Sequence, residues 1–244
     1  MIITEDLTKV FPSPSHDRQD HPALDGIKID ISVGEVISII GQNGSGKSTL
    51  LSILGGQIHD YEGKATIFGM DAIDFVRKHP VSYASEQAVF PPHWTVQQLM
   101  QRIARIQRLS KEVFDEKYHE LVIDFQLGRW IKSPLRALSK GMRQRVNLAQ
   151  SLLSESELII WDEPTSGLDW VFTDLVEEQI HKLKSQRKTL LFSTHDLKLA
   201  RSVANRLIHL REGNLRFAGE FIPWEVFLHT HGEPSEARLL KTAS

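Results

Sequence analysis

The sequence of 244 residues contains no cysteine. This absence excludes disulfide bonds and thiolate metal sites, and it does not by itself fix a compartment. The chain also lacks any apolar run near the ~20 residues that a membrane-spanning helix requires. Residues 1–6 have no basic stretch followed by a long apolar one, so we expect no signal peptide. If the protein works at a membrane, another chain must supply the span.

An excess of one charge is also missing, because 29 Lys and Arg residues nearly balance 31 Asp and Glu residues. This balance disfavours a nucleic-acid partner, since a polyphosphate backbone attracts a strongly basic surface. Hydrophobic residues at 41% and charged residues at 25% are ordinary for a globular protein. The length therefore predicts one large domain, or one domain with an inserted subdomain.

The most informative stretch is residues 41–49, Gly-Gln-Asn-Gly-Ser-Gly-Lys-Ser-Thr, which fits the phosphate-binding pattern G-x-x-x-x-G-K-[ST]. An apolar, β-branched run at residues 36–40 precedes it. After it, apolar residues recur at helical spacing: Leu50, Leu51, Ile53 and Leu54. The predicted context is a strand, a tight glycine turn and a helix, which favours a nucleotide site over a plain glycine-rich turn.

Each residue type in this loop suits the binding of a triphosphate. Three glycines can take backbone angles closed to residues with a Cβ, so successive N–H groups can converge on one oxyanion: Gly41, Gly44 and Gly46. The helix beginning near Lys47 adds the positive end of its dipole. We expect Lys47 to reach the β- and γ-phosphates, Ser48 to ligate Mg²⁺ and Thr49 to contact the α-phosphate. Asn43 and Ser45 complete the predicted nucleotide-binding loop.

Two carboxylates follow the buried-type strand predicted at residues 158–161. An apolar strand that ends in acidic residues, downstream of a phosphate loop, is the expected partner of that loop. Asp162 would hold the Mg²⁺ shell, and Glu163 is placed to polarise water. The alternative, an acidic turn at a strand end, is disfavoured because the phosphate loop is already present.

Two further residues have a structural and a functional interpretation. A buried strand at residues 189–194 leads to His195, and ligands bind where the strands of a parallel sheet end. His195 can therefore contact a phosphate, although a lone histidine at a strand end is more often structural. Phe11 lies just upstream of the phosphate loop, where it can stack on a purine or complete the core at the end of a strand.

The two ends of the chain read as β-structure followed by a tail. Residues 2–11 and 27–33 predict antiparallel strands, joined by a polar, proline-rich loop at residues 12–22. Residues 206–217 predict a hairpin. Residues 221–244 form a tail in which we expect a short docking helix.

The middle of the chain changes to helical patterns, and residues 87–137 read as all-helical. Thr95 opens one helix in a capping-box pattern. Ser110 opens a second helix, which we expect Gly128 to end. A further helix begins at Ser139 and leads to the strand that carries the carboxylates. This insertion is a candidate subdomain.

Five segments together resemble the motifs of an ATP-binding-cassette (ABC) ATPase, in the same order and over roughly residues 1–220. They are residues 41–49, 138–145, 158–164, 166–169 and 193–195. The resemblance implies an α/β fold: a P-loop NTPase core with a mainly parallel sheet, an N-terminal antiparallel β subdomain and an inserted α-helical subdomain. The whole chain would form a single ABC ATPase domain. Its parts would be residues 1–86 and 138–220 for the RecA-like core with its antiparallel β part, 87–137 for the helical subdomain and 221–244 for the tail.

The resemblance also implies a head-to-tail dimer that sandwiches two ATP molecules with Mg²⁺. Each ATP would lie between the phosphate loop of one subunit and the signature segment, Leu-Ser-Lys-Gly-Met, of the other. There, Ser139 and Gly141 at a helix N-terminus would donate to the γ-phosphate. Glu163 resembles the general base or water-orienting group, with Lys47 neutralising charge, and His195 resembles the residue that senses the γ-phosphate.

Other positions complete the implied site. Asp169 would lie in the loop that couples the two nucleotide sites, and Phe11 would stack on adenine. The glutamine expected after the strand at residues 81–84 is Glu86 by strict alignment, with Gln87 next to it. An oxygen of either side chain can reach Mg²⁺, so both are candidate metal ligands.

Four further positions depart from the usual pattern of the family. Lys140 and Met142 stand where the signature segment commonly has Gly and Gln. Such Ser-Lys-Gly-Met forms are similar to those of bacterial exporter-type ATPase subunits, which indicates variation rather than loss of activity. Trp161 and Trp170 occupy places where smaller residues are common.

We therefore predict the ATP-binding and ATP-hydrolysing subunit of a membrane ABC transporter, which dimerises around two ATP molecules and drives a separate permease for export. Its partners would be an integral membrane permease and a second copy of itself or a homologous ATPase subunit, with no nucleic acid. Its place would be peripheral, at the cytoplasmic face of the inner membrane. One alternative is a soluble ATP-driven clamp on ribosomes or DNA, although such relatives usually carry two cassettes or a long coiled-coil insertion. A phosphate-loop kinase is another, but it would need neither Ser139 nor His195.

Overall fold

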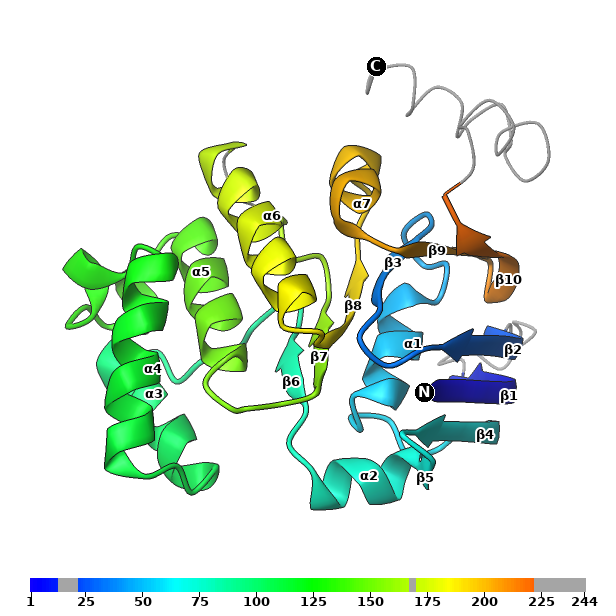
Figure 1. Ribbon diagram of the computed structural model, residues 1–244, viewed down its shortest axis with the longest axis horizontal. Helices are drawn as coiled ribbons and strands as arrows, with labels where there is room; N and C mark the ends of the chain where they lie inside the picture. The colour runs from blue at the N-terminus through cyan, green and yellow to red at the C-terminus, as the bar shows by residue number, and fades with distance from the viewer. Residues whose placement is uncertain (13–21, 167–169, 222–244) are drawn as a thin grey trace.

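The computed structural model describes residues 1–12, 22–166 and 170–221. Two β-sheets organise the helices around them (Figure 1). One sheet is antiparallel and N-terminal, and the other is mainly parallel, so the predicted fold class is confirmed. Asp169 and the docking helix predicted in the tail lie outside the described residues.

The antiparallel sheet has four strands in the order β2-β1-β4-β5. In chain order, their bounds are Ile2–Val10 for β1, Pro22–Ile31 for β2, Glu62–Ile67 for β4 and Met70–Asp71 for β5. β2 begins earlier than the predicted start at residue 27, because its pairing with β1 extends to Val10 opposite Pro22. A proline fits there because the first residue of a strand need not donate to the ladder.

The second sheet has six strands in the order β10-β9-β3-β8-β7-β6. Their bounds, in that order, are Asn214–Glu220, Arg206–Arg211, Val36–Ile40, Thr189–Ser193, Leu158–Trp161 and Ser82–Ala84. The predicted hairpin is β9 and β10, which pair antiparallel at the edge and extend to Glu220. All other neighbours pair in parallel. The residues that follow β3, β6, β7 and β8 therefore meet at the same edge of the sheet.

Seven α-helices and two 3-10 helices are found among the described residues. Their bounds are Lys47–Leu54 for α1, Ala72–Lys78 for α2, Val96–Ile106 for α3, Lys111–Asp124 for α4, Gly128–Trp130 for η1, Leu135–Ala137 for η2, Lys140–Ser151 for α5, Trp170–Ser185 for α6 and Leu197–Val203 for α7. Thr95 forms the predicted capping box with Gln98 at the start of α3. Ser110 and Ser139 cap α4 and α5, which confirms both predicted helix starts.

The predicted end of α4 at Gly128 is wrong. The helix ends at Asp124, and Gln126 takes the left-handed conformation with φ of 53°. The Leu127 N–H then donates to the carbonyl of Val122 at 2.9 Å, which closes the helix. A left-handed residue with a side chain costs roughly 1–2 kcal/mol. Burial of Phe125 and Leu127 in the core offsets this cost, and Gly128 begins η1 instead.

Two hydrophobic clusters cover opposite faces of the parallel sheet. In β7, Leu158 and Ile160 belong to the cluster shared with α1 and the antiparallel sheet. Ile159 and Trp161 belong to the cluster shared with α5 and α6. This division follows from the alternation of side chains along a strand. Both faces of β7 are therefore buried, which fixes the position of the residues that follow it.

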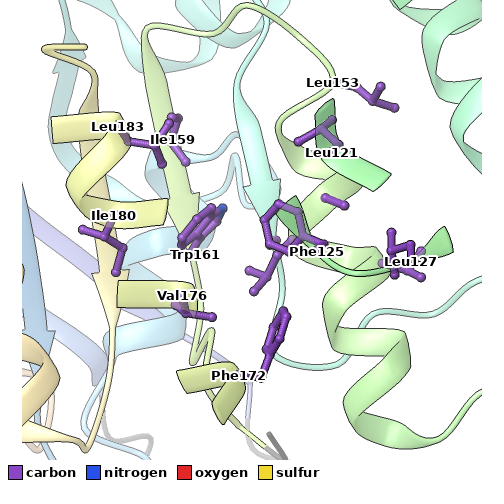
Figure 2. Close-up of a cluster of buried hydrophobic side chains, with 14 of the residues drawn as sticks. Leu121, Phe125, Leu127, Leu153, Ile159, Trp161, Phe172, Val176, Ile180 and Leu183 are labelled. Atoms are coloured by element: carbon purple, nitrogen blue, oxygen red, sulfur yellow. The ribbon is translucent and has the colours of Figure 1, made fainter. Parts of the chain in front are cut away.

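Trp161 is the largest fully buried side chain of the core. Figure 2 shows it between Val176 and Ile180 of α6 on one side and Phe125 on the other. Its Nε1 donates to Ser151 Oγ at 3.0 Å, so its polar atom is satisfied. Truncating a buried Trp to Ala typically costs about 3–5 kcal/mol. These contacts explain why a large side chain stands at position 161. They also hold the end of β7 in place directly before Asp162.

Residues 87–137 contain α3, α4, η1 and η2, which lie beside α5 at the end of the molecule away from the antiparallel sheet (Figure 1). Lys182 of α6 joins α4 to the sheet region: its Nζ lies 2.5 Å from Glu120 Oε1 and 2.9 Å from Asp124 Oδ2. The division of the chain into core and helical subdomain stays a prediction. None of the described helices is long and apolar enough to cross a membrane.

Candidate nucleotide site

The phosphate loop turns between β3 and α1, and two of its glycines have no room for a side chain. Gly41 has φ of 151°, and a Cβ there would collide with the Leu210 carbonyl. Gly46 is the N-cap of α1 with φ of 104°, and a Cβ there would lie 2.5 Å from the Ala23 carbonyl oxygen. Both positions therefore require glycine. The bare backbone at this helix N-terminus can bind an anion through its N–H groups.

Lys47 is the first residue of α1, and its ammonium group curls back over the loop. Nζ donates to the carbonyl of Gly41 at 2.8 Å and to that of Gln42 at 3.1 Å. The residue is only 6% exposed, and within the described ranges its partners are these carbonyls rather than a carboxylate. A buried cation without a counter-charge is costly, and one of its three donors is left over. Both facts fit an anionic ligand at the loop.

A cavity of about 350 Å³ opens on the phosphate loop. Its lining includes six of the predicted loop residues: Asn43, Gly44, Gly46, Lys47, Ser48 and Thr49. It also includes Phe11, Glu86 and Glu163 from three other parts of the chain. Gly41 and Ser45 shape the loop without lining the cavity. A cavity of about 380 Å³ between α4 and α6 contains none of the predicted residues, so the loop cavity is the candidate site.

The chain after β6 brings Glu86, and not Gln87, into the candidate site. Gln87 lines a neighbouring cavity of about 210 Å³ together with Lys140 and Arg143. Glu86 lines both of these cavities, so of the two candidate metal ligands it is the one that shares a cavity with Ser48.

One serine hydroxyl joins the two carboxylate residues at the end of β7. Ser193 Oγ accepts from the Glu163 N–H at 2.8 Å and donates to Asp162 Oδ1 at 2.5 Å. All three residues are buried. The contact follows from the register of the sheet, in which Trp161 of β7 pairs with Phe192 of β8. The sequence alone gives Ser193 no role of its own. Once β7 and β8 are known to be neighbours, the pairing of Trp161 with Phe192 brings the next residues, Asp162 and Ser193, together.

Glu163 has φ of 47°, in the left-handed region that residues with side chains rarely adopt. Such a conformation costs about 1–3 kcal/mol and persists where the surroundings fix it. Its Oε2 lies 2.9 Å from His195 Nδ1, so the two residues predicted to be catalytic are in contact. A carboxylate accepts, so Nδ1 carries the proton. The His195 side chain is 76% exposed, which leaves its other nitrogen accessible to a ligand.

Tyr83 of β6 joins the same region to the helix of the phosphate loop. Its hydroxyl lies 3.3 Å from Ser52 Oγ of α1. Burial raises the pKa of Tyr83 to about 12; the Ser52 contact opposes this rise, and the negative charge of Asp162 adds to it. The phenol therefore stays neutral at physiological pH.

Ser139 and Gly141 lie outside the candidate site. Ser139 is the N-cap of α5, and its Oγ accepts from the Met142 N–H at 3.1 Å. The N-terminus of α5 is exposed at Ser139 and Lys140. The predicted γ-phosphate donors therefore do not line the phosphate-loop cavity of their own chain.

The donor atoms suit an ion that is bound together with the nucleotide. In the described part of the chain, no three Asp, Glu or His side chains are close enough to hold a metal ion by themselves. Mg²⁺ usually takes one or two carboxylates and completes its shell with waters and substrate phosphates. Ser48 and Glu86 line the phosphate-loop cavity; Asp162 does not line it but directly precedes Glu163, which does. This set fits Mg²⁺ that shares its shell with phosphate oxygens.

A glycine loop over a buried lysine, with strand-end carboxylates and a histidine opposite, defines a P-loop nucleotide hydrolase. Comparison with known proteins agrees: the sequence matches the family model "ABC transporter" over residues 24–166. An uncharacterized ABC transporter ATP-binding protein of Nostoc sp. (strain PCC 7120) is 31% identical, over 99% of this chain and 73% of that protein. The ABC transporter ATP-binding protein NatA of Bacillus subtilis is 27% identical, over 81% of each chain.

Among solved structures, a dimeric post-hydrolysis state of the ATP-binding cassette MJ0796, bound to ADP and Pi, has a TM-score of 0.82 and 26% identity. The match covers 92% of this chain and all of that chain. The chain therefore belongs to the ABC transporter ATP-binding family, and it is an ATPase.

Proposed function

We propose that the chain is the ATP-hydrolysing subunit of a membrane transporter, which works as a head-to-tail dimer and drives a separate permease. The observation that carries this proposal is the division of the predicted residues between two places. Glu86 and Glu163 share a cavity with the phosphate loop, whereas Ser139 and Gly141 lie outside it. A full set of γ-phosphate contacts then needs a second chain, and the dimeric structure of the similar cassette supports this arrangement.

ATP binding rests on the phosphate loop in this proposal. The N–H groups at the start of α1 and the Lys47 ammonium bind the triphosphate, and Asn43 and Thr49 line the same cavity. Phe11 is half exposed at the wall of that cavity, where its ring can stack on adenine. Stacking of a base on an aromatic ring contributes about 1–3 kcal/mol.

Mg²⁺, when bound with ATP, would neutralise charge on the β- and γ-phosphate oxygens. The Ser48 hydroxyl and the carboxylates of Asp162 and Glu86 would hold it. Ser193 acts on this set through Asp162, because its hydroxyl fixes Oδ1 at 2.5 Å. Ser193 is therefore a positioning residue.

Glu163 is the proposed general base. It takes a proton from water as the water oxygen bonds to the γ-phosphorus and the bond to the β–γ bridging oxygen breaks, which gives ADP and phosphate. The His195 Nδ1–H donates to the Glu163 carboxylate at 2.9 Å and orients it. When the His195 ring also carries a proton on its other nitrogen, that N–H donates to the γ-phosphate. A positioned base typically contributes about 10²- to 10⁴-fold to the rate.

The partner chains follow from the same arrangement. Ser139 and Gly141 would donate to the γ-phosphate held by the other subunit, which is a second copy or a homologous ATPase subunit. Asp169 would couple the two sites. The permease spans the membrane, and this chain lies peripherally at the cytoplasmic face of the inner membrane. Export is proposed as the direction because Lys140 and Met142 give the signature segment its exporter-like form.

Co-purification tests the transporter proposal. The chain is tagged in its own host, membranes are solubilised in mild detergent, and the proteins that elute with it are identified. We expect a multi-span membrane protein. Recovery with ribosomes or DNA-associated proteins from the soluble fraction would instead support the alternative of a soluble clamp.

A further inference from the structure

Three amide side chains form a ladder along one face of α5. Gln144, Asn147 and Gln150 stand three residues apart, so they follow one another on the helix surface. Asn147 Nδ2 donates to the Ser85 carbonyl at 2.7 Å and to Gln144 Oε1 at 3.3 Å. Asn147 Oδ1 accepts from Gln150 Nε2 at 3.4 Å. The buried Asn147 amide thus uses both protons and its oxygen.

Main-chain carbonyls fix the direction of this amide ladder. The Ser85 carbonyl can only accept, so the Asn147 atom that faces it is the amide nitrogen. Gln144 then turns its Oε1 toward Asn147 and its Nε2 toward the carbonyls of Glu163 and Pro164, each at 3.4 Å. A flipped Asn147 amide would oppose oxygen to oxygen at 2.7 Å. Only one orientation of these amide groups therefore satisfies all of the hydrogen bonds in the ladder.

The amide ladder lies across the exits of β6 and β7. The last backbone contact between these exits is the Asp162 N–H, which donates to the Ala84 carbonyl at 2.8 Å. Ser85 follows β6 and directly precedes Glu86, and Glu163 follows Asp162. Glu86 and Glu163 both line the nucleotide cavity. Side chains of α5 thus bind the two segments just beyond the last backbone hydrogen bond between β6 and β7.

We propose that Asn147 is a positioning residue for Glu86. The inference rests on the metal role proposed above for Glu86 and deepens it. Asn147 does not line the nucleotide cavity and is only 2% exposed, so it acts through the Ser85 carbonyl. Its 2.7 Å contact is the shortest of the ladder. Without it the segment that carries Glu86 keeps only the longer contact from Gln150 Nε2 to the Tyr83 carbonyl at 3.4 Å, and the Glu86 carboxylate is less well positioned in the cavity that Ser48 also lines.

The test compares Asn147→Ala with Ser156→Ala, a control at the opposite ends of the same two strands. Ser156 is also 2% exposed; its one hydroxyl proton lies between the carbonyls of Pro80 at 2.8 Å and Leu158 at 2.6 Å, and its Oγ accepts from the Ser82 N–H at 3.3 Å. Each variant therefore loses buried hydrogen bonds to the β6 segment. The affinity for Mn²⁺ is measured by electron paramagnetic resonance with a non-hydrolysable ATP analogue, and kcat and KM for ATP are measured with Mg²⁺.

We expect Asn147→Ala to lower the Mn²⁺ affinity and kcat by about 10-fold or more, the usual effect of losing a group that orients a metal ligand. The KM for ATP should change little, because the phosphate loop is intact. Ser156→Ala should change neither quantity. Adding Asn147→Ala to Glu86→Ala should cause little further loss, because both remove the same ligand.

An unchanged Mn²⁺ affinity in Asn147→Ala, beside a lowered one in Glu86→Ala, overturns the inference and keeps the metal role of Glu86. An unchanged affinity in Glu86→Ala removes that metal role, and the inference falls with it. Equal losses in Asn147→Ala and Ser156→Ala also overturn it, because they indicate general loosening. If Asn147→Ala does not fold, Asn147→Ser leaves a smaller void yet cannot reach Ser85, and it is judged by the same outcomes.

Discussion

Replacing Ser193 by alanine tests how the ends of β7 and β8 hold the two carboxylate residues. The change removes a buried hydrogen bond from the Glu163 N–H at 2.8 Å and one to Asp162 Oδ1 at 2.5 Å. A buried donor without a partner costs about 1–3 kcal/mol, and a bond to a charged acceptor contributes about 1.5–3 kcal/mol. Because effects at one site do not add fully, we expect the free energy of unfolding to fall by about 2–4 kcal/mol.

Turnover should fall with the same substitution. Ser193 holds a proposed metal ligand and also the left-handed backbone of the proposed base, Glu163. Loss of such an orienting partner typically lowers activity by about 10- to 100-fold. The KM for ATP should stay close to that of the parent, since Lys47 and the loop are not touched. Urea denaturation and steady-state ATPase assays, below the melting temperature of the variant, measure both effects.

The matched control is Thr189→Val at the other end of β8. Thr189 is also buried, and its Oγ1 accepts from the Gly34 N–H at 2.9 Å. This isosteric change should cost about 1–3 kcal/mol of stability through an unsatisfied donor, with turnover unchanged. A Ser193→Ala variant with normal turnover, or a Thr189→Val variant that loses as much turnover, refutes the reasoning.

The remaining predictions concern three other regions. Gly46→Ala should abolish binding of a fluorescent ATP analogue, because its Cβ would lie 2.5 Å from the Ala23 carbonyl; Gly69→Ala, also at positive φ but with nothing within 4 Å, should retain it. Phe11→Ala should raise the KM for ATP by about 5- to 150-fold, the equivalent of ~1–3 kcal/mol of stacking, and leave competition by inorganic triphosphate unchanged. Lys182→Met should lower the free energy of unfolding by at most about 1 kcal/mol at pH 8, since the ion pairs are partly exposed. Burial lowers the pKa of Lys182, but its two carboxylate partners outweigh this and raise the pKa above 10.5. The contribution is therefore present below pH 10.5 and lost as the pH rises through the folded-state pKa, so urea titrations of parent and variant should converge there.

The elements that could be predicted best from the sequence are those with local signals. Thr95, Ser110 and Ser139 each accept from an N–H three residues further on, so the helix starts they predict depend on no distant contact. The strand β7 has its predicted bounds because four consecutive apolar residues are all buried. The glycines of the phosphate loop likewise adopt the positive φ values that the pattern requires.

Contacts set by the register of the sheet or by helix packing could not be predicted in this way. Ser193 meets Asp162 because β8 lies beside β7, and Asn147 meets Ser85 because α5 packs across the exits of two strands. The end of α4 also escaped local reasoning. Gln126 takes a left-handed conformation there that its residue type disfavours, because the residues on either side of it are buried in the core.

The most direct test of the central claim, that two chains complete each nucleotide site, is the solution mass of Glu163→Gln with ATP and Mg²⁺. By size-exclusion chromatography with light scattering, we expect a dimer with ATP and a monomer without it, with turnover at least about 100-fold below that of the parent. Adding Ser139→Ala should weaken the dimer, whereas Ser110→Ala, which removes the same kind of cap from α4, should not. A Glu163→Gln variant that binds ATP yet stays monomeric contradicts a site shared between two copies. One that hydrolyses ATP at nearly the parental rate removes Glu163 from the role of base.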